Sequence, residues 1–399
     1  FIQEQKYKLV MVKITLLGQI FNKLNRNLFN KIVAAYGGDK HNKGINSWTH
    51  LACMLFFQIA RLTSLREISD GLKSISGNLS HLGITKKCPT KSSLSYINKK
   101  RKSIIFEEFY YGLYERLSII SDFKKIKFRI KRKLLLLDST LITLCSKLFP
   151  WARYSKSKGA VKLHTLLDYE GCLPKYVYIS DGKMADVRAA KLIDIPHNSV
   201  VVADRGFEYF DLFNKWDKEN VTFVVRIKDS TGLIGYKEKE LPDDKNQDIL
   251  IDETVMLENK ETRDKYNKKL RHVTIYDAKN NTTIELLTNN FTWTAETISN
   301  LYKSRWQIES FFKELKTHLK IKTFIGTSQN AVEIQIWTAM ITMLILRYLK
   351  AIAKYGWCLS NLIAFLRLNL FVKIDLQYWL DTPFKPPGEE IENFQYKLF

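Results

Sequence analysis

The sequence Lys133-Leu-Leu-Leu-Leu-Asp138 starts a series of short apolar runs that decides the fold of this chain. Similar runs recur four times further along, and helical patterns separate the later ones. The runs lie at 161–168, 174–180, 199–204 and 221–227, and the helical patterns at 184–193 and 209–218. Short apolar runs bounded by turn signals are typical of buried strands. Three strands followed by helix, strand, helix and strand predict a mixed α/β sheet.

Two aspartates, Asp138 and Asp204, each follow four apolar residues, where we expect a buried strand to end. In open α/β sheets, ligands and catalytic groups gather at the carboxyl ends of the strands. Either aspartate alone would more often be a cap of a loop or helix. Together, on strands that we expect to be neighbours, they predict a metal-binding pair.

A third carboxylate lies in the helical segment Asn300-Leu-Tyr-Lys-Ser-Arg-Trp-Gln-Ile-Glu-Ser-Phe-Phe-Lys-Glu-Leu-Lys316. At about 100° per residue, four of its polar residues fall within an arc of roughly 60° beside an apolar face. These residues are Tyr302, Arg305, Glu309 and Lys316. One carboxylate beside two cations and a phenol suits a metal ion next to a phosphodiester. A solvated face with a Glu–Arg pair is the more common role of such charges on a helix.

The charge of the chain indicates its partner. The 399 residues include 63 Lys and Arg against 41 Asp and Glu, a formal net charge of +22. With 45% hydrophobic residues the chain can bury a core, which excludes wholesale disorder. A charge this large repels itself unless a polyanion neutralises it, so we expect nucleic acid as the partner. A basic protein of the membrane surface is the competing class. The best apolar run, Ile334 to Leu346, stops at Arg347, and we interpret it as a buried core helix rather than a membrane span.

The cysteines and the start of the chain indicate a compartment. Five scattered cysteines without paired spacing support neither a disulfide framework nor a zinc site. Because the chain opens without a secretory signal pattern, we expect a reducing cytoplasm. The first residue is Phe1 and the first methionine is Met11, so we interpret residues 1–10 as an upstream segment.

The N-terminal part reads as helical throughout. Ser64 and Thr90 are the expected N-caps of two short helices, at 64–72 and 89–102, and the second helix is basic. Such a pair fits a helix-turn-helix on DNA, and by spacing an ordinary helical hairpin fits equally well. The net charge favours DNA. The proposed DNA contacts of the second helix are Lys91, Asn98, Lys99 and Arg101.

These patterns predict four regions in order. A basic stretch from Lys124 to Lys133 marks the first boundary. The regions are an upstream segment at 1–10, a helical DNA-binding domain at 11–125, an α/β catalytic domain at 126–330 with a β-rich insertion at about 228–289, and a helical C-terminal region at 331–399. Because the C-terminal region contains long apolar runs, it is the expected dimer contact, and simple packing on the core is equally favoured.

The sequence blocks around the three carboxylates resemble those of bacterial insertion-sequence transposases of the DDE type, in the IS-four group. The family's Tyr-(2)-Arg-(3)-Glu-(6)-Lys signature is complete at 302–316. Its aspartate blocks resemble Leu136-Leu-Asp-Ser-Thr140 and Val202-Ala-Asp-Arg-Gly-Phe207, and its second strand resembles Lys158-Gly-Ala-Val-Lys-Leu-His164. The resemblance covers roughly residues 130–325.

The resemblance implies a ribonuclease H-like α/β fold with a catalytic, metal-binding triad of Asp138, Asp204 and Glu309. The implied cofactor is Mg²⁺, with Mn²⁺ as a substitute, since Mg²⁺ prefers oxygen ligands and two such ions can drive in-line phosphodiester displacement. The expected phosphate contacts are Tyr302, Arg305 and Lys316, and Trp293 is the candidate for stacking on DNA. Trp306 is expected to be structural, and His164 to be a core histidine.

The implied function is that of a DNA transposase that binds the terminal inverted repeats of its element, cleaves DNA and joins the 3′ ends to target DNA. We expect a homodimer on DNA, no membrane association, and a place in the bacterial cytoplasm at the nucleoid. Two alternatives stay open. One is a ribonuclease H-like nuclease without strand transfer, and the other is a non-catalytic DNA-binding protein derived from a transposase.

Overall fold

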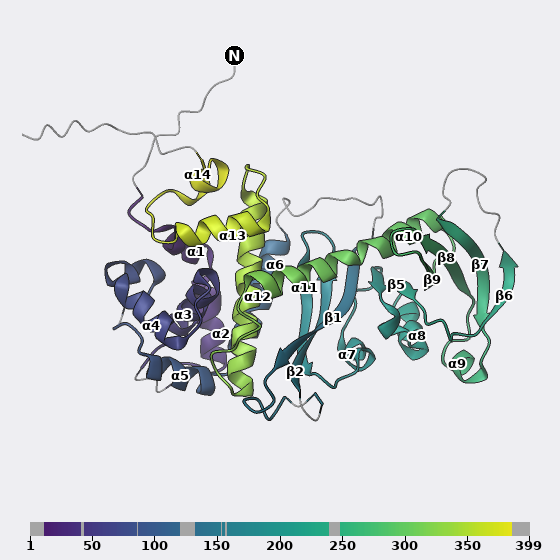
Figure 1. Ribbon diagram of the computed structural model, residues 1–399, viewed down its shortest axis with the longest axis horizontal. Helices are drawn as coiled ribbons and strands as arrows, with labels where there is room; N and C mark the ends of the chain where they lie inside the picture. The colour runs from purple at the N-terminus through teal and green to yellow at the C-terminus, as the bar shows by residue number, and fades with distance from the viewer. Residues whose placement is uncertain are drawn as a thin grey trace, which may run out of the picture. The chain divides into compact units, whose positions relative to one another are not determined.

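A computed structural model describes residues 12–40, 44–85, 87–119, 132–152, 154–155, 158–238 and 248–384 (Figure 1). The chain divides into two compact units. The helical unit comprises 1–117, 318–326 and 330–399, and the sheet unit comprises 118–317 and 327–329. The basic stretch that we expected to mark the first boundary lies almost entirely outside the described residues.

The sheet unit is built on a nine-stranded sheet in the order β3-β2-β1-β4-β5-β9-β8-β7-β6. Its first five strands are β1 Leu134–Leu144, β2 Gly159–Asp168, β3 Leu173–Asp181, β4 Val200–Ala203 and β5 Thr222–Arg226. β1 pairs antiparallel with β2, and β2 with β3, whereas β1, β4 and β5 run parallel. Three antiparallel strands continued by two parallel ones are the arrangement of the ribonuclease H-like fold. The predicted fold class is confirmed.

The insertion extends this same sheet. Its strands are β6 Leu233–Glu238, β7 Ile249–Leu257, β8 Leu270–Asp277 and β9 Thr282–Thr288, with the short helix α9 Lys260–Lys265. β9 pairs antiparallel with β5, where Val224 lies opposite Thr288. The sequence predicted that this segment is β-rich. It did not predict that the strands would join the catalytic sheet, because pairing between distant strands leaves no local pattern.

Five further elements surround the sheet. They are α7 Asp186–Leu192, the 3₁₀ turn η3 Arg205–Phe207, α8 Phe210–Lys218, α10 Ala295–Ser304 and α11 Trp306–His318. The buried cluster under α8 includes Phe213, Trp216 and Phe223. The single helix expected over the signature is divided at Arg305, which forms the C-cap of α10 before α11 begins.

The helical unit joins the N-terminal helices to the helices that follow the sheet unit in the chain. Its elements are α1 Leu16–Lys23, α2 Arg26–Ala35, α3 Ser47–Ala60, α4 Leu65–Ser74, η1 Ser76–Leu82, α5 Lys91–Lys100, α6 Ile104–Ser118, α12 Gln329–Ile352, α13 Leu359–Leu368 and α14 Leu376–Asp381. The N–H of Leu16 donates to the carbonyl of Val372, and the N–H of Leu17 to that of Leu370. The separate C-terminal region that we expected is therefore part of the same unit as the N-terminal helices.

Helix α12 is the core of the helical unit. In the described part of the chain it is the one helix long and apolar enough to cross a membrane, yet its most apolar stretch is 83% buried. Ile334, Leu344 and Leu346 are each at most 1% exposed. The interpretation as a core helix is confirmed. The side chains of Ile334 to Leu346 are buried and so not open to a second copy, while a dimer contact through other parts of 331–399 stays a prediction.

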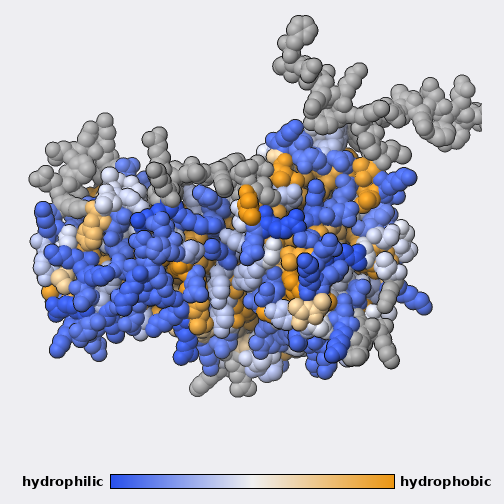
Figure 2. Space-filling model, turned by 180° about the vertical axis from the view of Figure 1, so that it is seen from behind, coloured by the Kyte–Doolittle hydropathy of each residue, from blue (hydrophilic) through white to orange (hydrophobic). Residues whose placement is uncertain are grey.

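The face of the molecule seen in Figure 2 is mostly hydrophilic, with apolar side chains in separate small patches. This is the surface expected of a chain with a formal net charge of +22.

Candidate active site

Asp138 and Asp204 lie side by side on two parallel strands. The last paired residues of β1 and β4 are Leu137 and Ala203, and each aspartate is the next residue in its chain. Only β4 ends there. β1 continues to Leu144 because β2 keeps supplying hydrogen-bond partners, so the expectation that Asp138 follows the end of its strand is wrong. The expected neighbourhood of the two strands is confirmed.

The signature residues reach both aspartates. Arg305 lies between two carboxylates, with its Nη1 3.6 Å from Asp138 Oδ2 and its Nη2 2.7 Å from Glu309 Oε1. The Tyr302 hydroxyl donates to Asp204 Oδ1 at 3.3 Å. Three carboxylates, a guanidinium and a phenol thus form one polar cluster at the end of β4.

Lys316 contacts β1 two residues beyond Asp138. Its Nζ donates to Thr140 Oγ1 at 2.5 Å. Thr140 is two residues beyond Asp138, so both side chains lie on the same face of β1. The structure therefore brings Arg305 and Lys316 onto one face of β1, although 176 residues separate Lys316 from Thr140 in the sequence.

Burial is the largest influence on the pKa values of Asp138 and Tyr302. It raises the pKa of Asp138 to about 6, against the lowering effects of the Ser139 N–H, which donates to Asp138 Oδ1 at 2.7 Å, and of Arg305. Burial likewise raises the pKa of Tyr302 to about 12. Burial lowers the pKa of Arg305, but Tyr302, Asp204 and Glu309 together raise it above its usual value. The pKa values of Asp138 and Tyr302 are thus raised by burial, and that of Arg305 is raised by the acidic groups around it.

The donor set fits a divalent metal ion. Asp138, Asp204 and Glu309 offer carboxylate oxygens, the ligands that Mg²⁺ prefers. Arg305 shows that this position favours a cation, since it pairs with two of the three carboxylates. Within the described ranges, no three His, Cys, Asp or Glu side chains are already arranged around one point as metal ligands. Joint binding of one ion therefore requires the carboxylates to turn from Arg305 toward the ion.

Comparison with known proteins agrees with this geometry. A family model described as the transposase DDE domain matches residues 129–345, more than half of the chain. The chain belongs to this family. A second model, a domain of unknown function (DUF4372), matches residues 12–85 of the transposase.

Curated relatives carry the same description. A putative transposase (y4zB) of Sinorhizobium fredii is 30% identical over 261 residues, which cover 65% of this chain and 71% of the relative. A probable transposase for insertion sequence element IS5377 of Geobacillus stearothermophilus is 29% identical, with 64% and 67% covered. A putative transposase for element IS4SA of Synechocystis sp. is 28% identical, with 72% and 80% covered.

One solved structure is similar over most of the transposase. It is a cryo-EM structure of a piggyBac transposase synaptic complex with hairpin DNA, 11% identical, with a TM-score of 0.42 and coverage of 94% of this chain and 82% of that chain.

Trp306 is the residue that the sequence interpretation missed. It follows Arg305 directly and its side chain is 65% exposed, so the expectation of a structural role is wrong. On a helical wheel Trp306 falls roughly opposite Ile308 and Leu315, which are buried. This position on the wheel is the signal in the sequence that could have predicted the exposure of Trp306. An exposed indole one residue after Arg305 can stack on an unpaired base.

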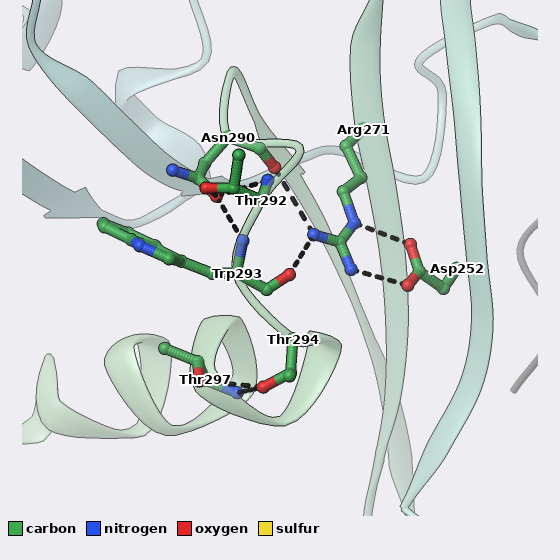
Figure 3. Close-up of polar contacts among 7 residues, drawn as sticks. All are labelled: Asp252, Arg271, Asn290, Thr292, Trp293, Thr294 and Thr297. Atoms are coloured by element: carbon green, nitrogen blue, oxygen red, sulfur yellow. Dashed lines mark hydrogen bonds and ion pairs between the residues drawn. The ribbon is translucent and has the colours of Figure 1, made fainter. Parts of the chain in front are cut away.

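Trp293, the original candidate for stacking, lies in the loop before α10 and is partly buried. Figure 3 shows its indole directed away from the buried ion pair of Arg271 and Asp252, in which Nε and Nη2 of Arg271 contact the two carboxylate oxygens at 2.7 and 2.6 Å. Arg271 Nη1 also donates to the carbonyl of Trp293. The loop backbone is thereby fixed to the insertion strands, while a DNA contact by Trp293 stays a prediction.

The same loop sets the start of α10. Asn290 Oδ1 accepts from the N–H groups of Thr292 and Trp293 at 3.1 and 2.8 Å, and Thr294 Oγ1 accepts from the N–H of Thr297 at 3.1 Å (Figure 3). The second contact is an N-cap. Helix α10, which ends next to Tyr302 and Arg305, therefore begins at a fixed point.

The basic helix of the helical unit is α5, and Thr90 caps it as expected, with Thr90 Oγ1 accepting from the N–H of Ser93. Asn98 is only 2% exposed, and its Oδ1 lies 3.2 Å from His50 Nε2. Arg101 is 8% exposed and donates to Asp39 and to the carbonyl of Ile45. The expectation that Asn98 and Arg101 lie on an open DNA-binding face is therefore wrong.

The exposed face of α5 has a different composition. Lys91 and Lys99 are exposed as expected, and Tyr96 projects from the same helix with 65% of its surface exposed. Ser92, Ser95 and Lys100 complete the exposed set. No acidic residue occurs in α5, whereas the exposed positions of α4 include Glu67 and Asp70. Positive charge on a helix without acidic residues of its own suits phosphate contacts.

Proposed function

We propose that this DNA transposase binds the ends of its insertion sequence, cleaves DNA by metal-assisted phosphodiester hydrolysis and joins the freed 3′ ends to target DNA. The observation that carries the proposal is the gathering of the signature around β1 and the end of β4. In a chain of the DDE family, that cluster supplies carboxylates for a metal and cations for a phosphate. The cluster comprises Asp138, Asp204, Tyr302, Arg305, Glu309 and Lys316.

Asp138, Asp204 and Glu309 are the proposed metal ligands, and Mg²⁺ is the proposed ion, with Mn²⁺ as a substitute. When bound, such an ion lowers the pKa of a water molecule and stabilises the leaving 3′ oxygen. Burial raises the pKa of Asp138 and so favours its protonated form, whereas a cation beside this carboxylate favours the ionised form that can bind a metal.

Arg305, Tyr302 and Lys316 are the proposed phosphate contacts. The planar guanidinium of Arg305 fits a phosphate in two-point contact as well as it fits a carboxylate. Tyr302 holds Asp204 through its hydroxyl, which keeps that carboxylate turned toward the cluster. We further propose that the exposed Trp306 stacks on a base beside the cleaved bond.

Binding of the element ends is assigned to the exposed face of α5, with Lys91 and Lys99 as phosphate contacts. Lys100 and Tyr96 extend that face. A homodimer on DNA follows from the need to cut and join two ends together. Because α12 is buried in its own unit, we expect the two copies to be held by the DNA and by other surfaces. The proposed place of action is the nucleoid of the bacterial cytoplasm.

The two alternatives, a nuclease without strand transfer and a non-catalytic binding protein, are not favoured, because the family and the curated relatives are transposases. A single assay separates all three. Labelled duplexes carrying the element's own ends are incubated with the full chain, Mg²⁺ and a target plasmid. We expect cut ends covalently joined to the plasmid. Cutting without joining would show a nuclease, and binding without cutting would show the DNA-binding protein.

A further inference from the structure

A second polar cluster lies on the other face of the sheet, directly behind Asp138. Asp138 faces Arg305 of the α10–α11 junction, and Ser139, the next residue of β1, points to the opposite face. Ser139 is paired with His164 on β2. The residue of α7 that meets this pair is Asp186, the first residue of the helix.

Asp186 gathers donors from both strands. Its Oδ1 lies 3.2 Å from Lys162 Nζ and 3.2 Å from His164 Nδ1, and it accepts a hydrogen bond from the Ser139 hydroxyl. Although burial acts to raise the pKa of Asp186, the contacts with His164, Ser139 and Lys162 lower it to about 2. Asp186 is therefore an ionised carboxylate with contacts to both β1 and β2.

The donors are themselves held in place. His164 is buried, and its Nε2 lies 3.0 Å from Ser180 Oγ on β3. Lys162 Nζ also donates to the carbonyl of Met184 at 3.1 Å, just before α7. The expectation that His164 is a core histidine rather than a metal ligand agrees with this position. The cluster ties three strands to the start of one helix.

The other side of Asp186 faces the turn after β4. A Cβ atom placed on Gly206 would lie 3.9 Å from Asp186 Oδ2. Gly206 is two residues beyond Asp204. Asp186 thus touches the residue next to one candidate metal ligand and lies against the turn that follows the other.

We infer that Asp186 is a positioning residue that sets the spacing of Asp138 and Asp204 for the metal ion. This inference rests on the proposed function, because it presumes that these two aspartates bind the ion. A shift of β1 at Ser139 would break its hydrogen bond to Asp186, and the helix that Asp186 begins, α7, packs against the turn η3 that follows Asp204. Residues that hold metal ligands in place without binding the ion themselves contribute about 10- to 100-fold to metal affinity or activity.

The chain offers a matched control at the other end of β2. Asp168 is a buried carboxylate paired with Lys133 at 2.6 Å, and it accepts from the N–H of Glu170. It lies beside Leu135, three residues before Asp138 on β1. Asp168→Asn therefore removes a comparable buried charge from the same sheet without touching Ser139 or Gly206.

The experiment titrates the DNA-free full chain with Mn²⁺ and follows the free ion by electron paramagnetic resonance. For Asp186→Asn we expect a dissociation constant raised about 10-fold or more with an unchanged number of bound ions, and for Asp168→Asn the wild-type constant. Equal constants for the two variants would overturn the inference. Loss of a bound ion in Asp186→Asn would also overturn it, by making Asp186 a ligand. Asp138→Asn tests the proposed function separately, since unchanged Mn²⁺ binding there would remove the metal site itself.

A second variant keeps the test independent of folding. Ser139→Ala removes only the hydroxyl that contacts Asp186. If both residues act through that contact, the effects of Ser139→Ala and Asp186→Asn on the Mn²⁺ constant will be less than additive in the double variant. Fully additive effects would contradict a shared role. Circular dichroism melting of each variant shows that the fold is retained.

Discussion

The Tyr302 hydroxyl donates a hydrogen bond to Asp204 Oδ1 at 3.3 Å, across 98 residues of sequence. This contact joins the last turn of α10 to the end of β4. It is the direct link between the signature helices and the second aspartate, and it explains why a phenol belongs to a signature otherwise made of charges. A hydroxyl can orient a carboxylate without competing with a metal for it.

Tyr302→Phe removes this hydrogen bond and leaves the ring in its buried place. We expect cleavage of end DNA to fall by about 10- to 100-fold, because Asp204 loses the group that orients it. Gel assays of nicking in Mg²⁺ measure the change. Lys303→Met, which alters an exposed neighbour of Tyr302 that pairs with Asp248, is the control and should cleave at the wild-type rate. Equal rates in the two variants would argue against an orienting role.

The three carboxylates should act as a unit. Asp138→Ala, Asp204→Ala and Glu309→Ala are each expected to reduce cleavage by more than about 100-fold, since loss of a ligand exceeds loss of an outer partner. End binding in a gel-shift assay should be largely retained, because α5 lies in a different unit. Substantial Mg²⁺-dependent cleavage by any of the three variants would remove that residue from the site.

Trp306→Ala separates a DNA contact from a packing role. Because the side chain is 65% exposed, we expect a melting temperature close to that of wild type, as for most surface changes. Cleavage should fall, since a stacked base contributes about 1–3 kcal/mol. Trp216→Ala, in the buried cluster under α8, should instead lower the melting temperature strongly. Wild-type cleavage by Trp306→Ala would exclude stacking.

The basic face of α5 should give a salt-dependent signature. Replacing both Lys99 and Lys100 by Ala is expected to weaken binding of end DNA by the full chain. The slope of log affinity against log salt should fall by about 0.9 for each phosphate that the variant no longer neutralises. Lys73→Ala is the matched control, because Lys73 on α4 pairs with Asp70 at 3.0 Å. A slope that stays at the wild-type value in the α5 variant would place DNA on another surface.

The stability of the helical unit should depend on pH through Glu107. Burial, with Glu108 and Glu333, raises the pKa of this carboxyl to about 7. The folded chain therefore holds this proton more tightly than the unfolded chain. The resulting stability is present below pH 4.5 and is lost as pH rises through 7.

Glu107→Gln replaces the carboxyl by a group that does not ionise, so it removes the loss of stability at high pH. We expect its melting temperature to exceed that of wild type by about 2–4 °C at pH 8, with a much smaller difference at pH 4. The exposed neighbour Glu108 provides the control, since Glu108→Gln leaves Glu107 buried and should gain less. A gain for Glu107→Gln that is equal at both pH values would contradict titration as its cause.

Local patterns in the sequence were enough to predict several features. The apolar runs predicted β1 to β5 because a strand that is buried on both faces of its sheet has apolar side chains at nearly every position. Ser64 and Thr90 were expected as N-caps, and both accept the N–H three residues on. The wheel of the signature placed Tyr302, Arg305, Glu309 and Lys316 on one edge, and these side chains do meet β1 and the turn after β4.

Packing in the folded chain decided which polar residues are open to a ligand. The basic helix α5 reads as equally charged along its length, yet Asn98 and Arg101 are buried against α3 and the residues before it, while Lys99 and Tyr96 are exposed. Asp186 gave no local signal because its partners come from three segments. Joining of the insertion to β5 depends likewise on distant pairing. The order of residues specified the chemistry of the site and its elements, whereas packing determined access and partners, because burial is set by what folds over a residue and not by its neighbours in the chain.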